Sequence, residues 1–292
     1  MTQPSTLSPI IAGCWRMASW QQTAQQRLAW IEQSIDLGIT SFDHADIYGG
    51  YEVQALFGQS LALKPGLRQK MQLISKAGIS ALNAKFPERK VKHYDSSAAH
   101  LIASAEQSLR DLGTDHLDVL LIHRPDPLSD WDEIAGAFEK LKNAGKVLAF
   151  GVSNFSVAQF AALNSRILLI TNQIELSALQ TQALHDGTLL QAQELERRPM
   201  IWSPLAGGKL FQTDDAQATR VQAALQEVAQ ELNVSISEVA YAWVMRHTSR
   251  PLIITGTQRP QALAEAIRAT EITLSREQWT LIWQSSLGHP VT

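Results

Sequence analysis

Short apolar runs alternate with longer amphipathic segments over almost the whole chain. The apolar runs lack the alternation of a half-exposed strand, so we expect strands buried on both faces, as in a parallel sheet. These strands are expected at residues 9–15, 40–43, 71–76, 117–122, 147–151, 168–173, 200–203 and 252–255. The amphipathic segments repeat apolar residues every three or four positions and predict helices. The helices are expected at residues 23–37, 51–63, 97–112, 130–143, 156–163, within 187–197, and at 214–232, 237–247, 259–269 and 275–285.

The order of these elements predicts the fold. Eight strands, each followed by helix, are typical of an α/β protein of the (β/α)8 barrel type, the TIM barrel. The competing fold is a doubly wound sheet, which usually carries Gly-x-Gly-x-x-Gly after its first strand. The corresponding turn here reads Gly13-Cys14-Trp15-Arg16-Met17, and the motif is absent from the rest of the sequence. Because no linker rich in Pro, Gly or Ser divides the chain, we expect a single barrel domain over residues 1–292.

Four polar residues follow the ends of the second, third and fourth predicted strands. Asp43, Lys76 and His123 each close an apolar run, and Tyr48 follows Asp43 by five residues on the next loop. Active sites of such barrels lie at the C-terminal ends of the strands, where these side chains would meet. Taken singly, each residue has a plain structural explanation, such as a turn, a surface position or a structural hydrogen bond. Their joint occurrence at one rim favours a catalytic set.

This set suits the reduction of a carbonyl, which needs a hydride on carbon and a proton on oxygen. Tyrosine has an ordinary pKa of about 10, and a neighbouring ammonium lowers that pKa by favouring the phenolate. We therefore expect Lys76 to make Tyr48 a better proton donor and Asp43 to keep Lys76 charged and oriented. We expect His123 to donate a hydrogen bond to the substrate oxygen.

Two other interpretations of the barrel stay open. A Schiff-base lyase would use Lys76 as the nucleophile that forms an imine with its substrate. A non-catalytic regulatory barrel would bind a nicotinamide nucleotide and act on a partner. Metal catalysis is disfavoured, since His123 and Asp126 have no third ligand at a suitable spacing.

Composition limits the partners and the cellular compartment that we expect for this protein. The 292 residues carry a net charge of -3 at pH 7, which gives no general attraction to nucleic acid or to anionic membranes. Cys14 is the only cysteine, so no disulfide can form within the chain, as suits a reducing cytosol. The sequence has neither a signal-peptide pattern nor a run of about 18 apolar residues. We expect a cytoplasmic monomer or weak homo-oligomer that takes a small carbonyl substrate and no nucleic-acid or membrane partner.

These motifs resemble the aldo-keto reductase family over nearly the whole chain. The family's catalytic pattern is matched by Asp43, Ala45, Tyr48 and Gly49, its lysine by Lys76 and its histidine by His123. The segment Gly151-Val152-Ser153-Asn154-Phe155 is among the most specific matches. The sequences of residues 43–50 and 123–127 most resemble those of a bacterial branch of oxidoreductases.

The resemblance implies a nicotinamide cofactor bound without a dinucleotide-binding sheet, with NADPH favoured and NADH as the alternative. It implies that Ser153, Asn154 and Gln173 hydrogen-bond the carboxamide and that Trp202 stacks on the nicotinamide ring. Small residues with accessible amides can also approach phosphate oxygens. The other residues implied for cofactor binding are Gly13, Cys14, Trp15, Ser203, Leu205, Gly207, Lys209, Gly256, Thr257, Arg259 and Glu265.

The sequence departs from the family pattern at three places. His44 stands beside the aspartate that matches the family's catalytic one. Its imidazole either belongs to the site or packs against the surrounding structure, and we favour the packing role. The pair Leu176-Ser177 replaces a familiar aromatic, so the wall of the substrate pocket should differ. Gly256 and Ala262 replace a lysine and an arginine that often hold the 2′-phosphate. Arg259 is the substitute that we expect, since a guanidinium suits bidentate phosphate binding.

Overall fold

The computed structural model describes residues 7–212 and 215–291. Eight parallel strands close into a barrel in the order β1-β10-β9-β8-β7-β6-β3-β2, which confirms the predicted (β/α)8 fold. The strands are β1 (Ile10–Gly13), β2 (Ser41–Asp43), β3 (Gln72–Ala77), β6 (Leu117–Ile122), β7 (Val147–Ser153), β8 (Leu169–Glu175), β9 (Met200–Trp202) and β10 (Leu252–Thr255). Every residue of β1, β2, β6 and β10 is buried, including the polar Ser41, Asp43 and Asp118, which agrees with the expected burial on both faces.

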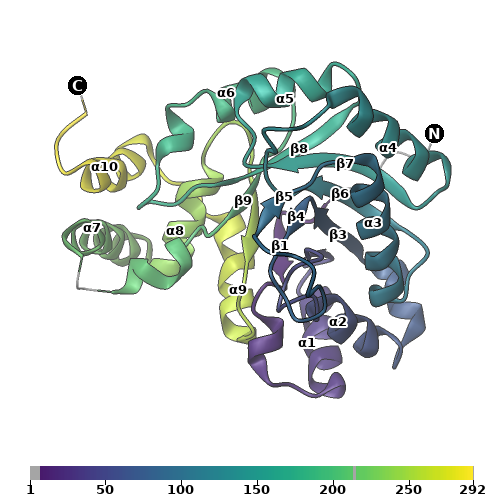
Figure 1. Ribbon diagram of the computed structural model, residues 1–292. Helices are drawn as coiled ribbons and strands as arrows, with labels where there is room; N and C mark the ends of the chain where they lie inside the picture. Colours follow the sequence, from purple (N-terminus) through teal and green to yellow (C-terminus); the bar gives the residue numbers. More distant parts are fainter. Residues whose placement is uncertain (1–6, 213–214, 292) are drawn as a thin grey trace. The chain divides into compact units, whose positions relative to one another are not determined.

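By their contacts the residues fall into two compact units, Met1–Gln173 and Ile174–Thr292. The single domain expected from the sequence stays a prediction. In the first unit, helices alternate with the strands and lie on their outer side (Figure 1). These helices are α1 (Ala24–Asp36), α2 (Val53–Leu61), α3 (Ala98–Leu112), α4 (Trp131–Asn143) and α5 (Val157–Asn164).

Side-chain caps explain where these helices begin. Thr23 and Ser156 form capping boxes with the glutamine three residues later, at the starts of α1 and α5. Ser97 accepts a hydrogen bond from the backbone of His100 at the start of α3, and Gly113 ends that helix with φ 65°. Both ends of α3 were predicted from the sequence. The predicted ranges of these three helices include the cap residue, so they begin one residue before the observed ranges.

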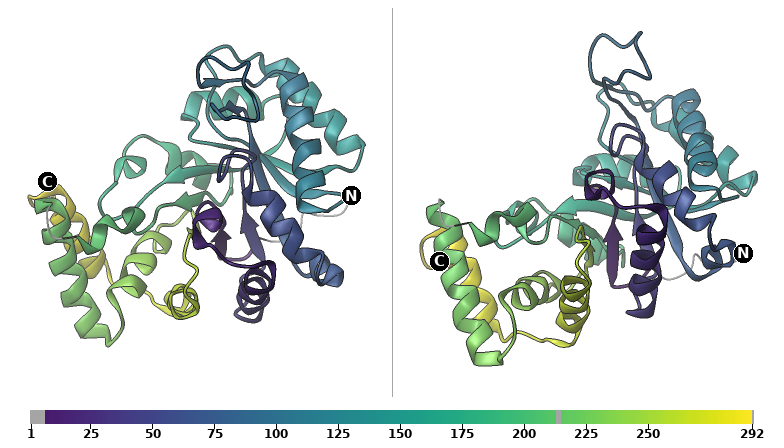
Figure 2. Two further views of the ribbon diagram at one scale, coloured as in Figure 1. Left: turned by 60° about the horizontal axis from the view of Figure 1, so that its bottom comes forward. Right: turned by 90° about the horizontal axis from the view of Figure 1, so that it is seen from below.

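The second unit contains a pair of stacked tryptophans that join two of its helices. The rings of Trp243 and Trp279 lie 5.1 Å apart and nearly parallel, and each indole nitrogen donates to the other residue's backbone oxygen at 3.0 Å. Trp283 lies 5.5 Å from Trp279, so both tryptophans share one face of their helix, as predicted. Helices α7 and α10 lie side by side (Figure 2). The helices are α6 (Thr188–Glu194), α7 (Ala216–Leu232), α8 (Ile236–Met245), α9 (Pro260–Arg268) and α10 (Arg276–Leu287).

The predicted start of α7, at Asp214, lies outside the described residues. Throughout the segments that the structure describes, no helix is both long and apolar enough to cross a bilayer.

Short elements without a repeating pattern had no counterpart among the predicted ones. Strands β4 (Ile79–Ser80) and β5 (His93–Tyr94) form an antiparallel hairpin outside the barrel. The segment that joins them projects from the first unit (Figure 2). Five short 3-10 helices were also absent from the prediction: η1 (Met17–Trp20), η2 (Pro65–Lys70), η3 (Gln182–Leu184), η4 (Ala206–Phe211) and η5 (Ala269–Glu271).

Candidate active site

The register of three neighbouring strands brings Asp43 and Lys76 together. Asp43 pairs with Ile74 across β2 and β3, and Lys76 pairs with Leu121 across β3 and β6. The ammonium of Lys76 lies 2.8 and 2.7 Å from the two carboxylate oxygens of Asp43. Both side chains are almost fully buried, at 1% and 4% exposure. The ends of these strands therefore hold a buried ion pair at the predicted position.

Lys76 has two further acceptors. Its ammonium lies 2.8 Å from the backbone oxygen of His44 and 3.1 Å from the hydroxyl of Tyr48. Burial lowers the pKa of Lys76, but the negative charge of Asp43, the charge of Tyr48 and its hydrogen bonds to both outweigh burial, so the pKa is raised. Lys76 therefore stays protonated and can donate to the phenol oxygen.

The structure corrects the expected acidity of Tyr48. Burial raises the pKa of its hydroxyl above the ordinary value of 10.0, and the charge of Lys76 opposes this effect without cancelling it. The prediction of a lowered pKa was wrong because it counted the neighbouring cation and not the loss of solvent around the phenol. Tyr48 therefore holds its proton firmly at neutral pH.

His123 follows β6 and faces the same phenol. Its backbone N–H donates to Ala77 at 2.8 Å, and its ring lies 5.8 Å from the ring of Tyr48 at 77°. Burial lowers its pKa well below 6.5, and the charge of Lys76 lowers it further. Within residues 7–212 and 215–291, the buried Nδ1 of His123 has no hydrogen-bond partner. The imidazole is therefore neutral and has one N–H to donate.

His44 contributes its backbone and not its ring. The ring is fully buried and packs edge-on against Phe57, with 4.6 Å between the centroids. Burial, followed by the charge of Lys76, lowers the pKa of His44 to about 3. The side chain is thus a neutral packing group, whereas the carbonyl helps to orient Lys76. Sequence reasoning missed this carbonyl, since no side-chain pattern marks it.

Asp46 is a further carboxyl close to the site. Its backbone N–H donates to the carbonyl of Lys76 at 3.1 Å. Its Oδ1 is buried and has no partner among the described residues. Burial raises the pKa of Asp46 to about 7, although hydrogen bonds from Ile47 and Ser104 and the charge of Arg89 act in the opposite direction. The pKa of Asp46 therefore lies near neutrality beside the loop that carries Tyr48, a property that the sequence did not indicate.

The residues expected to bind the carboxamide lie at the ends of β7 and β8. The Ser153 hydroxyl donates to the backbone oxygen of Gln173 at 3.0 Å, and the Asn154 amide donates to Ser153 Oγ at 2.7 Å. The amide of Gln173 donates to Asp43 Oδ1 at 2.9 Å. Gln173 therefore also orients the carboxylate of Asp43, a role that the sequence did not predict. Gly151 is required here, because a Cβ would lie 2.7 Å from Leu121 and 2.8 Å from a backbone oxygen.

The first strand also contributes to this end of the first unit. Gly13 pairs with Asp43, and the backbone N–H of Cys14 donates to the Asp43 carbonyl at 2.9 Å. The Cys14 side chain is buried, whereas Trp15 is 60% exposed. Of these three cofactor candidates, Trp15 alone presents a large accessible side chain.

The remaining cofactor candidates belong to the second unit. Trp202 ends β9, and the loop after it holds an unusual run of left-handed backbone, with positive φ at Ser203, Ala206, Gly207 and Gly208. Such a loop can turn consecutive amides toward one side, which suits an anion. The others lie in or beside this loop, after β10 or along α9: Leu205, Lys209, Gly256, Thr257, Arg259 and Glu265.

Arg259 stands at the start of α9. It is exposed, and its backbone N–H donates to Thr257 Oγ1 at 3.1 Å. The N-terminal end of a helix carries partial positive charge, which adds to that of the guanidinium. The residue is therefore chemically suited to a phosphate.

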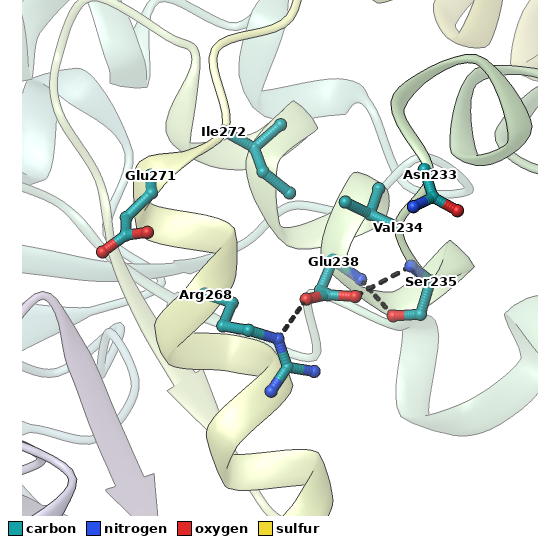
Figure 3. A pocket seen from close by; sticks show the side chains of 7 residues that line it. All are labelled: Asn233, Val234, Ser235, Glu238, Arg268, Glu271 and Ile272. Atoms are coloured by element: carbon teal, nitrogen blue, oxygen red, sulfur yellow. Dashed lines mark hydrogen bonds and ion pairs between the residues drawn. The ribbon is translucent and has the colours of Figure 1, made fainter.

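A pocket of about 470 Å³ in the second unit contains none of the predicted site residues (Figure 3). It lies between the start of α8 and the end of α9. There Arg268 donates to Glu238 at 2.7 Å, and Glu238 also accepts from the backbone of Ser235 at 2.8 Å. Arg268 and Glu238 of this pocket thus pair with each other, and Glu238 helps to cap a helix.

Known proteins are similar to this chain over nearly its whole length. The model of the aldo/keto reductase family matches residues 9–286. Oxidoreductase YdhF of Escherichia coli is 47% identical, with 100% of both chains covered. A 6-dehydroglucose reductase of Agrobacterium fabrum is 42% identical, with 98% of this chain and 96% of that protein covered. An aldo/keto reductase of Klebsiella pneumoniae, crystallised with NADP and acetate, superposes with a TM-score of 0.77 at 25% identity and covers 97% of this chain and 92% of its own.

Proposed function

Since this chain belongs to the aldo-keto reductase family, we propose that it reduces aldehydes or ketones with NADPH and that Tyr48 donates the proton. Membership itself makes the chain a carbonyl-reducing oxidoreductase and confirms the family resemblance of its sequence. The cofactor, the proton donor and the substrate are the proposed part. The observation that carries the proposal is the 3.1 Å contact from the Lys76 ammonium to the Tyr48 hydroxyl.

The proposed proton transfer follows from how this hydroxyl is held. Because Lys76 donates to the phenol oxygen, the phenol's own hydrogen must point elsewhere and is left for the substrate oxygen. When bound, NADPH supplies the hydride to the carbonyl carbon. The oxygen then gains alkoxide character and becomes a stronger base than a phenolate, so transfer from Tyr48 does not require a lowered pKa. Lys76 stabilises the phenolate that remains.

Neutral His123 has the complementary role in this proposal. With Nδ1 buried and without an acceptor among the described residues, the ring hydrogen is best placed on Nε2. From there it would donate to the carbonyl oxygen and fix its direction. A neutral donor also leaves Lys76 as the only cation of the catalytic set, which avoids repulsion between two buried positive charges.

The residues present fit a nicotinamide cofactor by their chemistry. In the first unit, Ser153, Asn154 and Gln173 provide hydroxyl and amide groups of the kind that pair with a carboxamide. In the second unit, the left-handed loop before Lys209 suits phosphate groups. Arg259 favours NADPH over NADH, because its guanidinium can bind the 2′-phosphate that only NADPH carries.

The reaction class is tested by the absorbance of the dihydronicotinamide. Both cofactors are offered with aldehydes, dicarbonyls, quinones and a sugar aldehyde, the last because a relative is named 6-dehydroglucose reductase. We expect oxidation of NADPH that disappears in Tyr48→Phe. Tight NADPH binding without any oxidation would instead favour a regulatory barrel. Borohydride trapping of a substrate on Lys76 would favour a lyase.

Cofactor choice is tested by Arg259→Ala. We expect the Kd for NADPH to rise about tenfold and that for NADH to stay within about twofold, because only NADPH carries the 2′-phosphate. Arg276→Ala, an exposed arginine in the first turn of α10, is the charge-matched control. Equal weakening of both cofactors by Arg259→Ala would refute a contact with the 2′-phosphate.

A further inference from the structure

The segment between β4 and β5 is strongly basic in an otherwise acidic chain. Residues 81–92 contain Lys85, Arg89, Lys90 and Lys92 but a single acidic residue, Glu88, whereas the whole chain has a net charge of -3. The segment begins five residues after Lys76, because β4 follows the C-terminal end of β3. These cations therefore gather at the end of the barrel where the catalytic set lies.

Hydrogen bonds tie this basic segment to the loop that carries Tyr48. The hydroxyl of Tyr51 accepts from the backbone of Ala81 at 2.9 Å and from Arg89 at 2.6 Å. Lys85 donates to the backbone oxygen of Tyr51 at 3.1 Å, and Asn83 donates to the neighbouring backbone oxygen at 3.2 Å. Tyr51 is only three residues from the proposed proton donor. The segment is thus anchored beside the catalytic loop.

Two cations near the catalytic histidine come from different loops. Arg124 is the next residue after His123, and Lys92 lies directly before β5. The positive charges of both reach the imidazole of His123 and contribute to its lowered pKa, after burial and Lys76. Lys92 is exposed, and no salt bridge involving it occurs among the described residues. Its ammonium is therefore accessible to an anion in solution.

Two acidic side chains that are close to these cations along the chain accept backbone hydrogen bonds. Asp126 is buried and accepts hydrogen bonds from the backbone of Ser96 and of Leu128. Asp95 accepts from the backbone of Ser97. Over residues 81–97 and 123–127, five basic side chains still outnumber the three acidic ones, so the net local charge is positive.

We propose that the basic segment and Arg124 select carbonyl substrates that carry an anionic group, with Lys92 and Arg124 attracting that group while His123 and Tyr48 meet the carbonyl. The proposal rests on the proposed reductase function. A carboxylate, a sulfonate and a phosphate share the required chemistry, since each offers a negatively charged oxygen to an ammonium or guanidinium. The field also raises the rate of encounter with such substrates.

The test compares matched aldehydes with the intact protein and NADPH. The anionic probes are 4-carboxybenzaldehyde and 4-formylbenzenesulfonate, and the neutral probe is methyl 4-formylbenzoate. We expect Lys92→Ala and Arg124→Ala each to lower kcat/KM for the anionic probes about fivefold and to leave the neutral ester within about twofold. Lys92→Glu should cause a larger loss for the anions alone. Added salt should reduce the anionic preference of the unmodified protein.

Lys70→Ala is the matched control, because Lys70 is an exposed lysine at the opposite end of β3. It should change neither class of probe. Equal losses for anionic and neutral probes in the Lys92 and Arg124 variants would overturn the proposal, as would a preference for the ester that salt does not alter. A response to one anion class only would identify the group that is selected and would support the proposal.

A binding measurement separates this inference from the proposed function. Calorimetric titration of 4-carboxybenzaldehyde into the protein with NADP+ involves no turnover. Weaker binding in Lys92→Ala than in Lys70→Ala would support the anion site even if no aldehyde were reduced, and that lack of reduction would then count against the reductase assignment alone. The same affinity for the acid and the ester in this titration would refute the anion site.

Discussion

An almost fully buried ion pair and a mostly buried one lie toward opposite ends of β3 in the first unit, and they use their hydrogen-bonding groups differently. Before β3, Arg68 donates to Thr114, to the backbone oxygens of Met71 and His116, and to Asp118, all at 2.8 to 2.9 Å. Asp118 also accepts from the backbone of Leu73 at 2.8 Å. Near the end of β3, Lys76 is equally well bonded, to Asp43, His44 and Tyr48.

The two ion pairs differ in whether an acceptor of the cation keeps a proton that it can still donate. The acceptors of Arg68 are backbone oxygens, a carboxylate and a hydroxyl that itself donates to His116 at 3.2 Å. One acceptor of Lys76 is the Tyr48 hydroxyl, whose own proton is not needed for that bond. A satisfied network stabilises a fold, whereas one with a proton left over at the C-terminal end of a barrel can perform chemistry.

The largest effect on kcat is expected from removing the proton that Tyr48 is proposed to donate. Tyr48→Phe removes the donor and should lower kcat about a thousandfold, within the range typical of general acid catalysis. The Kd for NADPH should change little, because the phenol oxygen is not among the proposed cofactor contacts. Steady-state kinetics and a fluorescence titration measure the two quantities. Turnover close to that of the unmodified protein would exclude Tyr48 as the acid.

Loss of the buried ammonium should affect both activity and stability. Lys76→Met should lower kcat about a hundredfold and the free energy of unfolding by about 3 kcal/mol, because Asp43 is left as an unpaired buried charge. Adding Asp43→Asn should recover much of the stability and none of the activity. Urea denaturation and kinetics on the same samples separate the two effects. Recovery of activity in the double variant would contradict the catalytic role of the pair.

At the Arg68–Asp118 ion pair, we expect a substitution to lower stability and to leave activity unchanged. Arg68→Ala should lower the free energy of unfolding by about 3 kcal/mol, since Asp118 loses the guanidinium that neutralises its charge in a mostly buried position. Under folding conditions kcat should stay within about twofold. The exposed Arg110→Ala is the control and should alter stability by no more than about 0.5 kcal/mol. A large loss of kcat in folded Arg68→Ala would remove the contrast between the two ends of β3.

The smallest effect concerns the carboxyl that lacks a full set of partners. Folding raises the pKa of Asp46 from 3.8 to about 7, so between these values the folded state binds more protons than the unfolded state. Stability should therefore fall as pH rises from 4 to 7. Asp46→Asn should lack this loss and therefore be more stable than the unmodified protein at pH 8, where the carboxyl is ionised. Denaturation at a series of pH values measures it, and parallel curves for both proteins would show that Asp46 does not titrate in this range.

The sequence by itself determined the barrel and named the residues of the proposed catalytic set. Alternating apolar and amphipathic segments predicted eight strands, and Asp43, Lys76 and His123 stood at strand ends where register brings neighbours together. These features are local, because periodicity and strand termini are set by residues close along the chain.

Only the tertiary structure decided the electrostatics of the site. The sign of the Tyr48 pKa shift depends on how much solvent the whole surroundings exclude, and no motif encodes that quantity. The bond from Gln173 to Asp43 joins residues 130 positions apart, and the anchoring of the basic segment on Tyr51 joins separate loops. Such contacts arise from the packing of distant segments. The sequence can therefore identify the site residues, but it does not give the direction of their pKa shifts.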